Sequence, residues 1–260
     1  MLKLTAVAKA YQRGGMDAPA VGPINLSVPT RQFVSILGPS GCGKSTLLKC
    51  VAGLMVPSEG TILLDGRPVQ GVPDSTVYIF QEYTRSLFPW LRLLGNVVFP
   101  LSGAMPRQDA LAKAHHYIAM VGLKGFESHY PWEMSGGMQQ RAAIARALVK
   151  EPNFLLMDEP FGSLDAQTRT RLEDMLLSLW MAKPRTVLFV THDIEEAIYL
   201  SDRVLVMNGH PGCIVDDIEI ELKRPRSQIE SKEDRRFADY RRRLYGLLAD
   251  PSPERAHASS

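Results

Sequence analysis

The segment that most constrains this chain spans residues 38–46 and reads GPSGCGKST. It follows a strand-like apolar run at residues 32–37 and leads into a helix-like stretch at residues 45–54. Glycines allow close backbone approach, successive N–H groups and the helix start face an anion, Lys44 adds positive charge, and Ser45 offers a hydroxyl to Mg²⁺. The predicted phosphate-binding loop consists of Gly38, Pro39, Ser40, Gly41, Cys42, Gly43, Lys44, Ser45 and Thr46.

A second feature is the apolar run at residues 154–157, which ends in Asp158 and Glu159. Taken alone, such a pair is usually a solvated strand end, but the phosphate-binding loop upstream reverses that interpretation. Ligands of parallel sheets bind at the carboxyl ends of the strands, and adjacent strand residues point in different directions. We therefore expect Asp158 to hold Mg²⁺ and Glu159 to act as the general base.

The composition excludes some classes of protein. Among 260 residues, 30 basic and 28 acidic side chains leave a net charge of +2, which gives no reason to expect nucleic acid as a partner. The three cysteines lack metal-ligand spacing and the first residues lack an export signal, so a reducing cytosol is expected. Cys42 lies in the loop at a helix N-terminus, where we expect the thiolate to be favoured and alkylation to inhibit.

The order of patterns predicts an α/β fold. Strand-like runs at residues 3–8 and 25–29, separated by a loop at 14–23, indicate an N-terminal β layer. Buried strands at residues 154–157, 186–190 and 203–207 alternate with helices, which is typical of a mostly parallel sheet with flanking helices. The fold class is thus a P-loop NTPase core with an N-terminal antiparallel β layer and an inserted helical subdomain.

The predicted organisation is one ATPase domain at residues 1–222 with a helical insert at about 82–150, followed by residues 223–260. Within the insert, residues 107–121 and 136–149 carry apolar residues at helical spacing. Beyond the domain we expect a surface helix at residues 234–245 and a disordered tail from about Pro251. The arginines of that helix allow either a solvated face or contact with lipid headgroups.

Ser135, Gly136 and Gly137 form a second anion site, since Ser135 can cap the helix that follows the glycine pair. One polypeptide does not need two cradles for the same phosphate so far apart in sequence. This segment resembles the defining Ser-Gly-Gly motif of ATP-binding cassette (ABC) proteins, and the resemblance covers nearly all of the first 220 residues. It implies a homodimer in which Ser135, Gly136 and Gly137 contact the ATP held by the partner subunit.

The resemblance also assigns roles residue by residue. Tyr11 resembles the aromatic that stacks on adenine, and Gln81 the glutamine that senses Mg²⁺ and the attacking water. His192 is similar to the histidine that contacts the γ-phosphate, and Asp165 belongs to the loop that joins the two sites. Read without the family, His192 would be a strand-end cap and Tyr11 a packing residue.

Catalysis is thus expected from Lys44, Gln81, Glu159 and His192, and Mg²⁺ binding from Ser45, Gln81 and Asp158, with ATP as the nucleotide. Two departures from the family pattern are Met134 before the Ser-Gly-Gly motif and Met138 after it. Both keep the bulk of the usual residue, so we expect hydrolysis to survive.

Longer runs, such as LLMDEPFGSLDAQTR at residues 155–169, resemble ATPase subunits of bacterial nitrate, sulfonate and taurine importers. This implies a peripheral subunit on the cytoplasmic face of the inner membrane that serves a solute-binding protein indirectly. The aromatic segment 81–90 would form a groove for the transmembrane permease, although Phe88 and Trp90 fit a plain core equally well. Residues 93–105 are too short an apolar stretch to span a bilayer.

Two alternatives belong to other classes. One is a soluble mechanical cassette that acts on nucleic acid or the ribosome, but such proteins carry coiled-coil insertions or a second cassette. The other is a regulator that binds nucleotide without hydrolysing it, against which Glu159 and His192 both argue.

Overall fold

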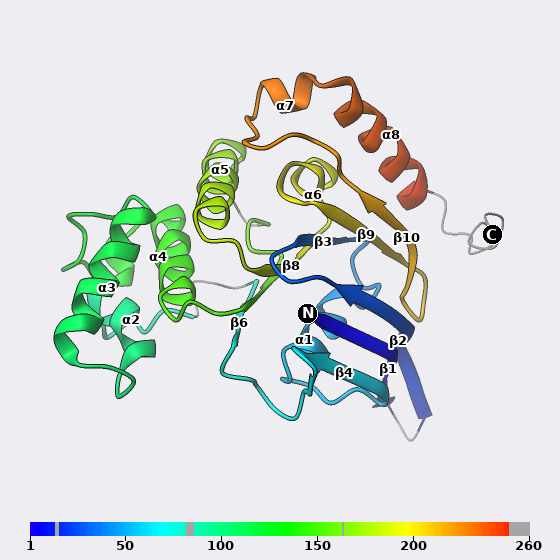
Figure 1. The fold of residues 1–260 in the computed structure, drawn as a ribbon, viewed down its shortest axis with the longest axis horizontal. Coiled ribbons are helices and arrows are strands. Elements are labelled where there is room, and N and C mark those ends of the chain that lie inside the picture. Colours follow the sequence, from blue (N-terminus) through cyan, green and yellow to red (C-terminus); the bar gives the residue numbers. More distant parts are fainter. Residues whose placement is uncertain (14–15, 82–85, 163, 250–260) are drawn as a thin grey trace.

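A six-stranded sheet forms the centre of the protein in this computed structural model, which describes residues 1–13, 16–81, 86–162 and 164–249 (Figure 1). Its strands are β3 (Phe33–Leu37), β6 (Thr76–Ile79), β7 (Phe154–Asp158), β8 (Thr186–Thr191), β9 (Arg203–Asn208) and β10 (Cys213–Glu219). The strand order is β10-β9-β3-β8-β7-β6, and every neighbouring pair except β9 with β10 is parallel. β3, β7 and β8 are buried along their whole length, which explains their continuous apolar sequences.

A second, antiparallel sheet covers one side of the first. It consists of β1 (Leu2–Arg13), β2 (Met16–Val28), β4 (Glu59–Leu64) and β5 (Arg67–Pro68), in the order β2-β1-β4-β5. The predicted loop at residues 14–23 is wrong from Met16 onward, because strand β2 already begins there. Pro19 and Pro23 favoured a loop in the sequence, but β2 is an edge strand. Proline is tolerated at an edge because the N–H that it lacks can face away from the neighbouring strand.

Helices flank the central sheet and gather beside it. The short helix α1 (Lys44–Val51) follows the phosphate-binding loop. It ends earlier than the predicted residue 54, and Gly53, just past its end, adopts a φ of 71°. The remaining helices of the domain are α2 (Leu93–Val98), η2 (Phe99–Leu101), α3 (Arg107–Met120), η3 (Pro131–Glu133), α4 (Gly136–Leu148), α5 (Ala166–Ala182) and α6 (Ile194–Leu200). Figure 1 shows α2, α3 and α4 grouped at the left, at the β6 edge of the central sheet.

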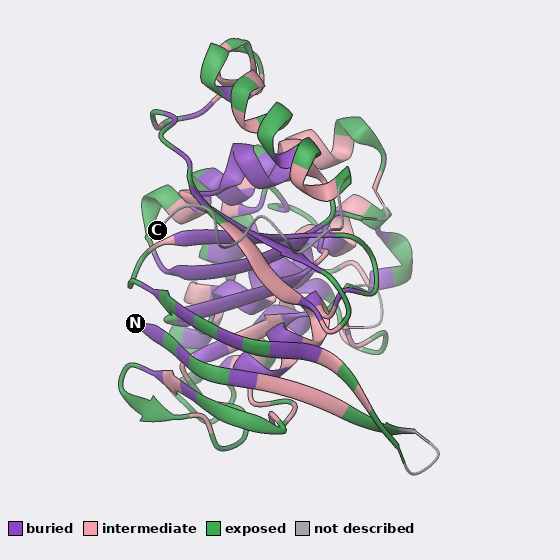
Figure 2. Cartoon of the chain, turned by 90° about the vertical axis from the view of Figure 1, so that its right-hand side faces the viewer, coloured by how far each residue is buried: buried purple, intermediate pink, exposed green. Residues whose placement is uncertain are grey.

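The central sheet separates two hydrophobic cores, because successive side chains of a strand point to opposite faces. On β3, Phe33 and Leu37 belong to the core built with α4, α5 and α6. Val34 and Ile36 belong to the core built with α1 and the antiparallel sheet. Figure 2 shows the resulting pattern, with buried central strands between partly exposed outer layers. The predicted fold class is confirmed by this arrangement.

The C-terminal helices α7 (Glu230–Glu233) and α8 (Arg235–Ala249) lie over the outer side of α6 (Figure 1). Phe237 and Leu244 of α8 are fully buried there. The basic face of α8 is paired within the chain, with Arg241 3.1 Å from Glu195 and Arg243 2.8 Å from Asp216. These pairs favour the solvated-face interpretation of this helix over a lipid contact. The predicted tail from Pro251 lies outside the described residues.

Candidate functional site

The phosphate-binding loop connects β3 to α1 and is tightly enclosed by backbone. Gly41 and Gly43 adopt φ values of 84° and 97°, in the left-handed region that glycine tolerates best. A Cβ atom on Gly38 would come within 2.1 Å of the Met207 carbonyl oxygen, and one on Gly43 within 2.5 Å of the Ala20 carbonyl oxygen. The glycines at positions 38 and 43 are therefore required by close packing of the loop against β9 and β2.

Lys44 places its charge inside this loop. Its side chain is almost fully buried, and its ammonium group donates hydrogen bonds of 2.8 Å to the carbonyl oxygens of Gly38 and Pro39. A buried ammonium surrounded by oxygen acceptors lies where an anion would gain most from it. The same group lies 3.9 Å from Oε1 of Glu159, which connects the loop to the end of β7.

Glu159 lies at the centre of the predicted catalytic residues. Its Oε2 accepts a hydrogen bond of 3.3 Å from Nε2 of Gln81 and lies 3.1 Å from Nδ1 of His192. Gln81 follows β6, Glu159 follows β7 and His192 follows β8, so three neighbouring strands deliver these side chains to one edge of the sheet. The structure thus brings Lys44, Gln81, Glu159 and His192 together, at the edge where parallel sheets bind ligands.

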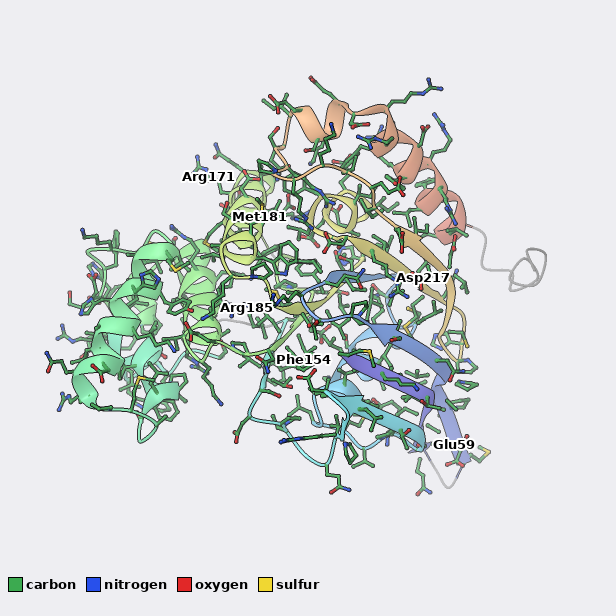
Figure 3. All side chains as sticks on the ribbon, in the orientation of Figure 1. Glu59, Phe154, Arg171, Met181, Arg185 and Asp217 are labelled. Atoms are coloured by element: carbon green, nitrogen blue, oxygen red, sulfur yellow. The ribbon has the colours of Figure 1, made fainter. Side chains whose placement is uncertain are left out.

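Glu159 itself has a backbone φ of 42°, which is uncommon for a residue other than glycine, asparagine or aspartate. Glu159 lies at the carboxyl end of β7. Figure 3 labels Phe154 at the opposite, amino-terminal end of β7 and Arg185 just before the start of β8. Asp158 is the last residue of β7, and Glu159 follows it directly, where Oε2 of Glu159 meets Gln81 and His192 while Asp158 meets Ser45 and Tyr78. The two adjacent carboxylates therefore occupy different environments, as the sequence reading expected.

Asp158 is nearly buried and has a hydroxyl donor on each oxygen. Ser45 Oγ donates a hydrogen bond of 2.7 Å to Oδ1, and the Tyr78 hydroxyl donates one of 2.7 Å to Oδ2. Mg²⁺ prefers hard oxygen ligands and usually keeps several waters, so the Ser45 and Asp158 oxygens fit this ion. The described residues contain no group of three or more His, Cys, Asp or Glu side chains arranged for a metal. Phosphate oxygens and water would have to complete such a shell.

Tyr11 lies beside this region. Its hydroxyl is 3.0 Å from Oγ1 of Thr46, the residue after Ser45, and its ring is partly exposed. The aromatic side chain therefore lies at the outer rim of the phosphate-binding loop, within reach of a ligand that extends beyond it.

Ser135, Gly136 and Gly137 lie apart from the Glu159 cluster. Ser135 caps α4, and its Oγ accepts a hydrogen bond of 3.3 Å from the Met138 amide. The motif lines a cleft of about 680 Å³ together with Asp165, and this cleft includes none of the residues around Glu159. None of residues 38–46 lines this cleft either, so the serine-glycine motif and the phosphate-binding loop of one chain do not share it. Ser163, two residues before Asp165, lies outside the described residues.

The expectation that the Cys42 thiolate is favoured is wrong. The thiol is only 2% exposed, and burial raises its pKa, outweighing the lowering effect of nearby Lys44. Its Sγ donates to the carbonyl oxygen of Met207 at 3.5 Å. The Cys42 side chain thus points into the core beneath the loop, which position in the sequence alone did not indicate.

Near Gln81 a cleft of about 640 Å³ lies between β6 and α4, and its lining includes Phe80 and Arg146. Phe88 packs against Phe99 with ring centres 4.7 Å apart, and Trp90 is 69% exposed. A plain core interpretation therefore does not hold for Trp90, whereas Phe88 is half-buried and packed against Phe99. Residues 82–85 of the predicted groove lie outside the described part of the chain.

Comparison with known proteins decides the family. The sequence profile of the family described as "ABC transporter" matches residues 21–162. The chain belongs to the ABC transporter family. As expected from its motifs, this cassette is an ABC-type ATPase.

Two relatives illustrate the similarity. An uncharacterized ABC transporter ATP-binding protein of Methanocaldococcus jannaschii is 45% identical over 96% of this cassette and 91% of its own length. The aliphatic sulfonates import ATP-binding protein SsuB of a Bacillus cereus strain is 43% identical over 96% of this cassette and 99% of its own length.

Among solved structures, the ATP-binding cassette MJ0796 superposes with a TM-score of 0.74 and 34% identity, over 85% of this cassette and 99% of that chain. That structure is described as a dimer in a post-hydrolysis state bound to ADP and Pi. Across the described residues, no helix combines the length and apolar character that crossing a membrane requires.

Neither Tyr78 nor Arg169 was predicted from the sequence to belong to the site. Arg169 on α5 contacts Asp193 at 3.1 Å and donates a 3.3 Å hydrogen bond to the Leu164 carbonyl oxygen, which links the Asp165 loop to the turn after His192. Tyr78 lies three residues before Gln81 in an apolar strand, where a tyrosine gives no signal of its own. Only the pairing of β6 with β7 shows that it reaches Asp158.

Proposed function

We propose that this cassette hydrolyses ATP at a site shared between two copies and thereby powers an importer of small solutes. The observation that carries the proposal is the convergence of Lys44, Gln81 and His192 on Glu159 at the carboxyl edge of the sheet. The separate Ser135 cleft supports the shared site, since neither residues 38–46 nor the residues around Glu159 line it.

In this mechanism residues 38–46 enclose the β- and γ-phosphates through backbone N–H groups and the Lys44 ammonium. Glu159 accepts a proton from water, whose oxygen attacks the γ-phosphorus while the bond to the β,γ-bridging oxygen breaks and ADP leaves. Gln81 and His192 orient that water and the γ-phosphate. Tyr11 stacks on the adenine.

Ser45, Asp158 and Gln81 would hold Mg²⁺ on the phosphates. When bound, Mg²⁺ neutralises charge that develops on the phosphate oxygens. Ser135, Gly136 and Gly137 would close over the ATP of the partner subunit, and Asp165 would lie at the seam between the two copies.

The similarity to SsuB over 99% of its length supports an importer of sulfonates or similar solutes, such as taurine or nitrate. We place the homodimer on permease subunits at the cytoplasmic face of the bacterial inner membrane, with a solute-binding protein on the other side. The cleft beside Gln81 and the exposed Trp90 would receive the permease. Reconstitution with the permease and binding protein, with each solute in turn, identifies the cargo by the ATPase stimulation that it causes.

Replacing Glu159 by Gln tests the hydrolytic site. Loss of the general base should lower turnover at least about 100-fold. ATP affinity should remain, and ATP should now trap a dimer that size-exclusion chromatography separates from monomer. Glu219→Gln, an exposed carboxylate on β10, is the matched control and should hydrolyse ATP normally. Equal turnover in the Glu159 and Glu219 variants would remove Glu159 from the mechanism.

A further inference from the structure

The carboxylate of Asp158 is held by two hydroxyl groups from different parts of the chain. Ser45 Oγ donates to Oδ1 and the Tyr78 hydroxyl donates to Oδ2, each at 2.7 Å. With only 5% of Asp158 exposed, water has little access to replace either partner. Two donors on opposite oxygens fix the plane of the carboxylate, whereas one donor alone would leave it free to turn about the other.

Strand pairing places Tyr78 within reach of Asp158. β6 runs parallel to β7 with Tyr78 opposite Leu156, two residues before Asp158. The ring packs against Phe80, with ring centres 4.5 Å apart, and joins the core on the α1 side of the sheet. A packed ring limits the positions that its hydroxyl can take, so this donor is fixed by the fold.

The surroundings of Tyr78 also favour its neutral form. Burial raises the pKa of its hydroxyl well above the ordinary value, and the neighbouring Asp158 carboxylate raises it further. Both effects favour the protonated hydroxyl. It can act only as a donor toward the Asp158 carboxylate, which accepts hydrogen bonds and has none to give.

We propose that Tyr78 is a positioning residue that sets the orientation in which Asp158 meets Mg²⁺ and its water shell. This inference rests on the proposed function, in which Asp158 and Ser45 serve the metal. Partners that orient a metal ligand commonly change metal affinity about 10- to 100-fold when removed. The Tyr78 hydroxyl donates to Asp158, whereas Lys44 donates to the carbonyl oxygens of Gly38 and Pro39, so removing the hydroxyl should have an effect only when the metal is present.

The test is Tyr78→Phe, which removes one oxygen atom and keeps the ring. ADP affinity is measured by calorimetry with Mg²⁺ and again with EDTA, and the ratio of the two Kd values gives the metal-dependent gain. We expect this ratio to be about tenfold smaller in the variant, with the Kd for ADP in EDTA unchanged. In ATP hydrolysis, the Mg²⁺ concentration for half-maximal turnover should rise, with kcat largely restored at high Mg²⁺.

Tyr117→Phe is the matched control, because this partly buried hydroxyl also donates to a carboxylate, that of Glu151, at 3.0 Å. It should leave the metal-dependent gain unchanged. A Tyr78→Phe variant that keeps the gain within twofold, or that weakens ADP binding equally in EDTA, would overturn the inference. Asp158→Asn separates the two claims. If both variants keep the metal-dependent gain, the proposed role of Asp158 fails. If Asp158→Asn loses the gain and Tyr78→Phe keeps it, only the role of Tyr78 fails.

Discussion

At the scale of single residues, the site shows how one side chain's surroundings decide its chemistry. Asp158 and Glu159 are adjacent, yet one is fixed between two hydroxyls and the other faces an amide, an imidazole and an ammonium. Of the two, Glu159 alone has a positive φ. The proposed metal-binding carboxylate and the proposed proton-accepting carboxylate are therefore consecutive residues with different partners.

The same reasoning applies to Cys42. Its thiol is buried and its pKa is raised by that burial, so the reactive thiolate is depleted near neutral pH. We expect iodoacetamide at mildly alkaline pH to modify the partly exposed Cys213 before Cys42, as peptide mass spectrometry would resolve. Faster labelling of Cys42 than of Cys213 in the folded protein would show that the loop opens far more than this structure implies.

At the scale of elements, Glu151 connects three helices. It follows α4 and accepts from Lys113 of α3 at 3.2 Å, from Lys183 just after α5 at 2.8 Å, and from the Tyr117 hydroxyl. These partners, Lys183 first, lower the pKa of Glu151 from 4.5 to about 2. Since the folded-state pKa lies below the unfolded value, the stabilisation is complete above pH 4.5 and is lost as the pH falls toward 2.

Glu151→Gln should therefore destabilise the protein at neutral pH by about 1 kcal/mol, a small value because the carboxylate is about a third exposed. As the pH falls from 4.5 to 2, the wild type should lose the extra free energy of unfolding that the Glu151 carboxylate provides. The variant has no carboxylate at this position and should show no such loss. Chemical denaturation across that pH range checks both statements. A constant difference between the two proteins at every pH would show that the ion pairs do not connect these helices energetically.

At the scale of the whole molecule, the two halves of the proposed ATP site do not share a cleft in one chain, because none of residues 38–46 lines the cleft of the serine-glycine motif. A shared site predicts that two inactive variants can rescue each other. Lys44→Ala spoils the phosphate-binding loop, and Ser135→Arg fills the cleft of the serine-glycine motif. A heterodimer of the two contains one site with both defects and one site with neither.

Each variant alone should lack turnover, and mixing equal amounts should restore roughly a quarter of the wild-type rate if pairing is random and the sites act independently. ATPase assays on the mixture measure this directly. Mixing Lys44→Ala with Glu159→Gln is the control, because both changes affect the same half-site and every dimer then lacks an intact site. No recovery in the first mixture would mean that one chain holds the complete site.

The sequence by itself determined the phosphate-binding loop, the Asp158-Glu159 pair and the serine-glycine helix start. Each is a run of consecutive residues whose backbone chemistry acts locally, so spacing was sufficient. The tertiary structure alone decided that Tyr78 reaches Asp158, that Cys42 is buried, and that β2 extends across its prolines as an edge strand. Those features depend on which distant segments become neighbours, and that outcome is set by strand order and packing rather than by any local pattern.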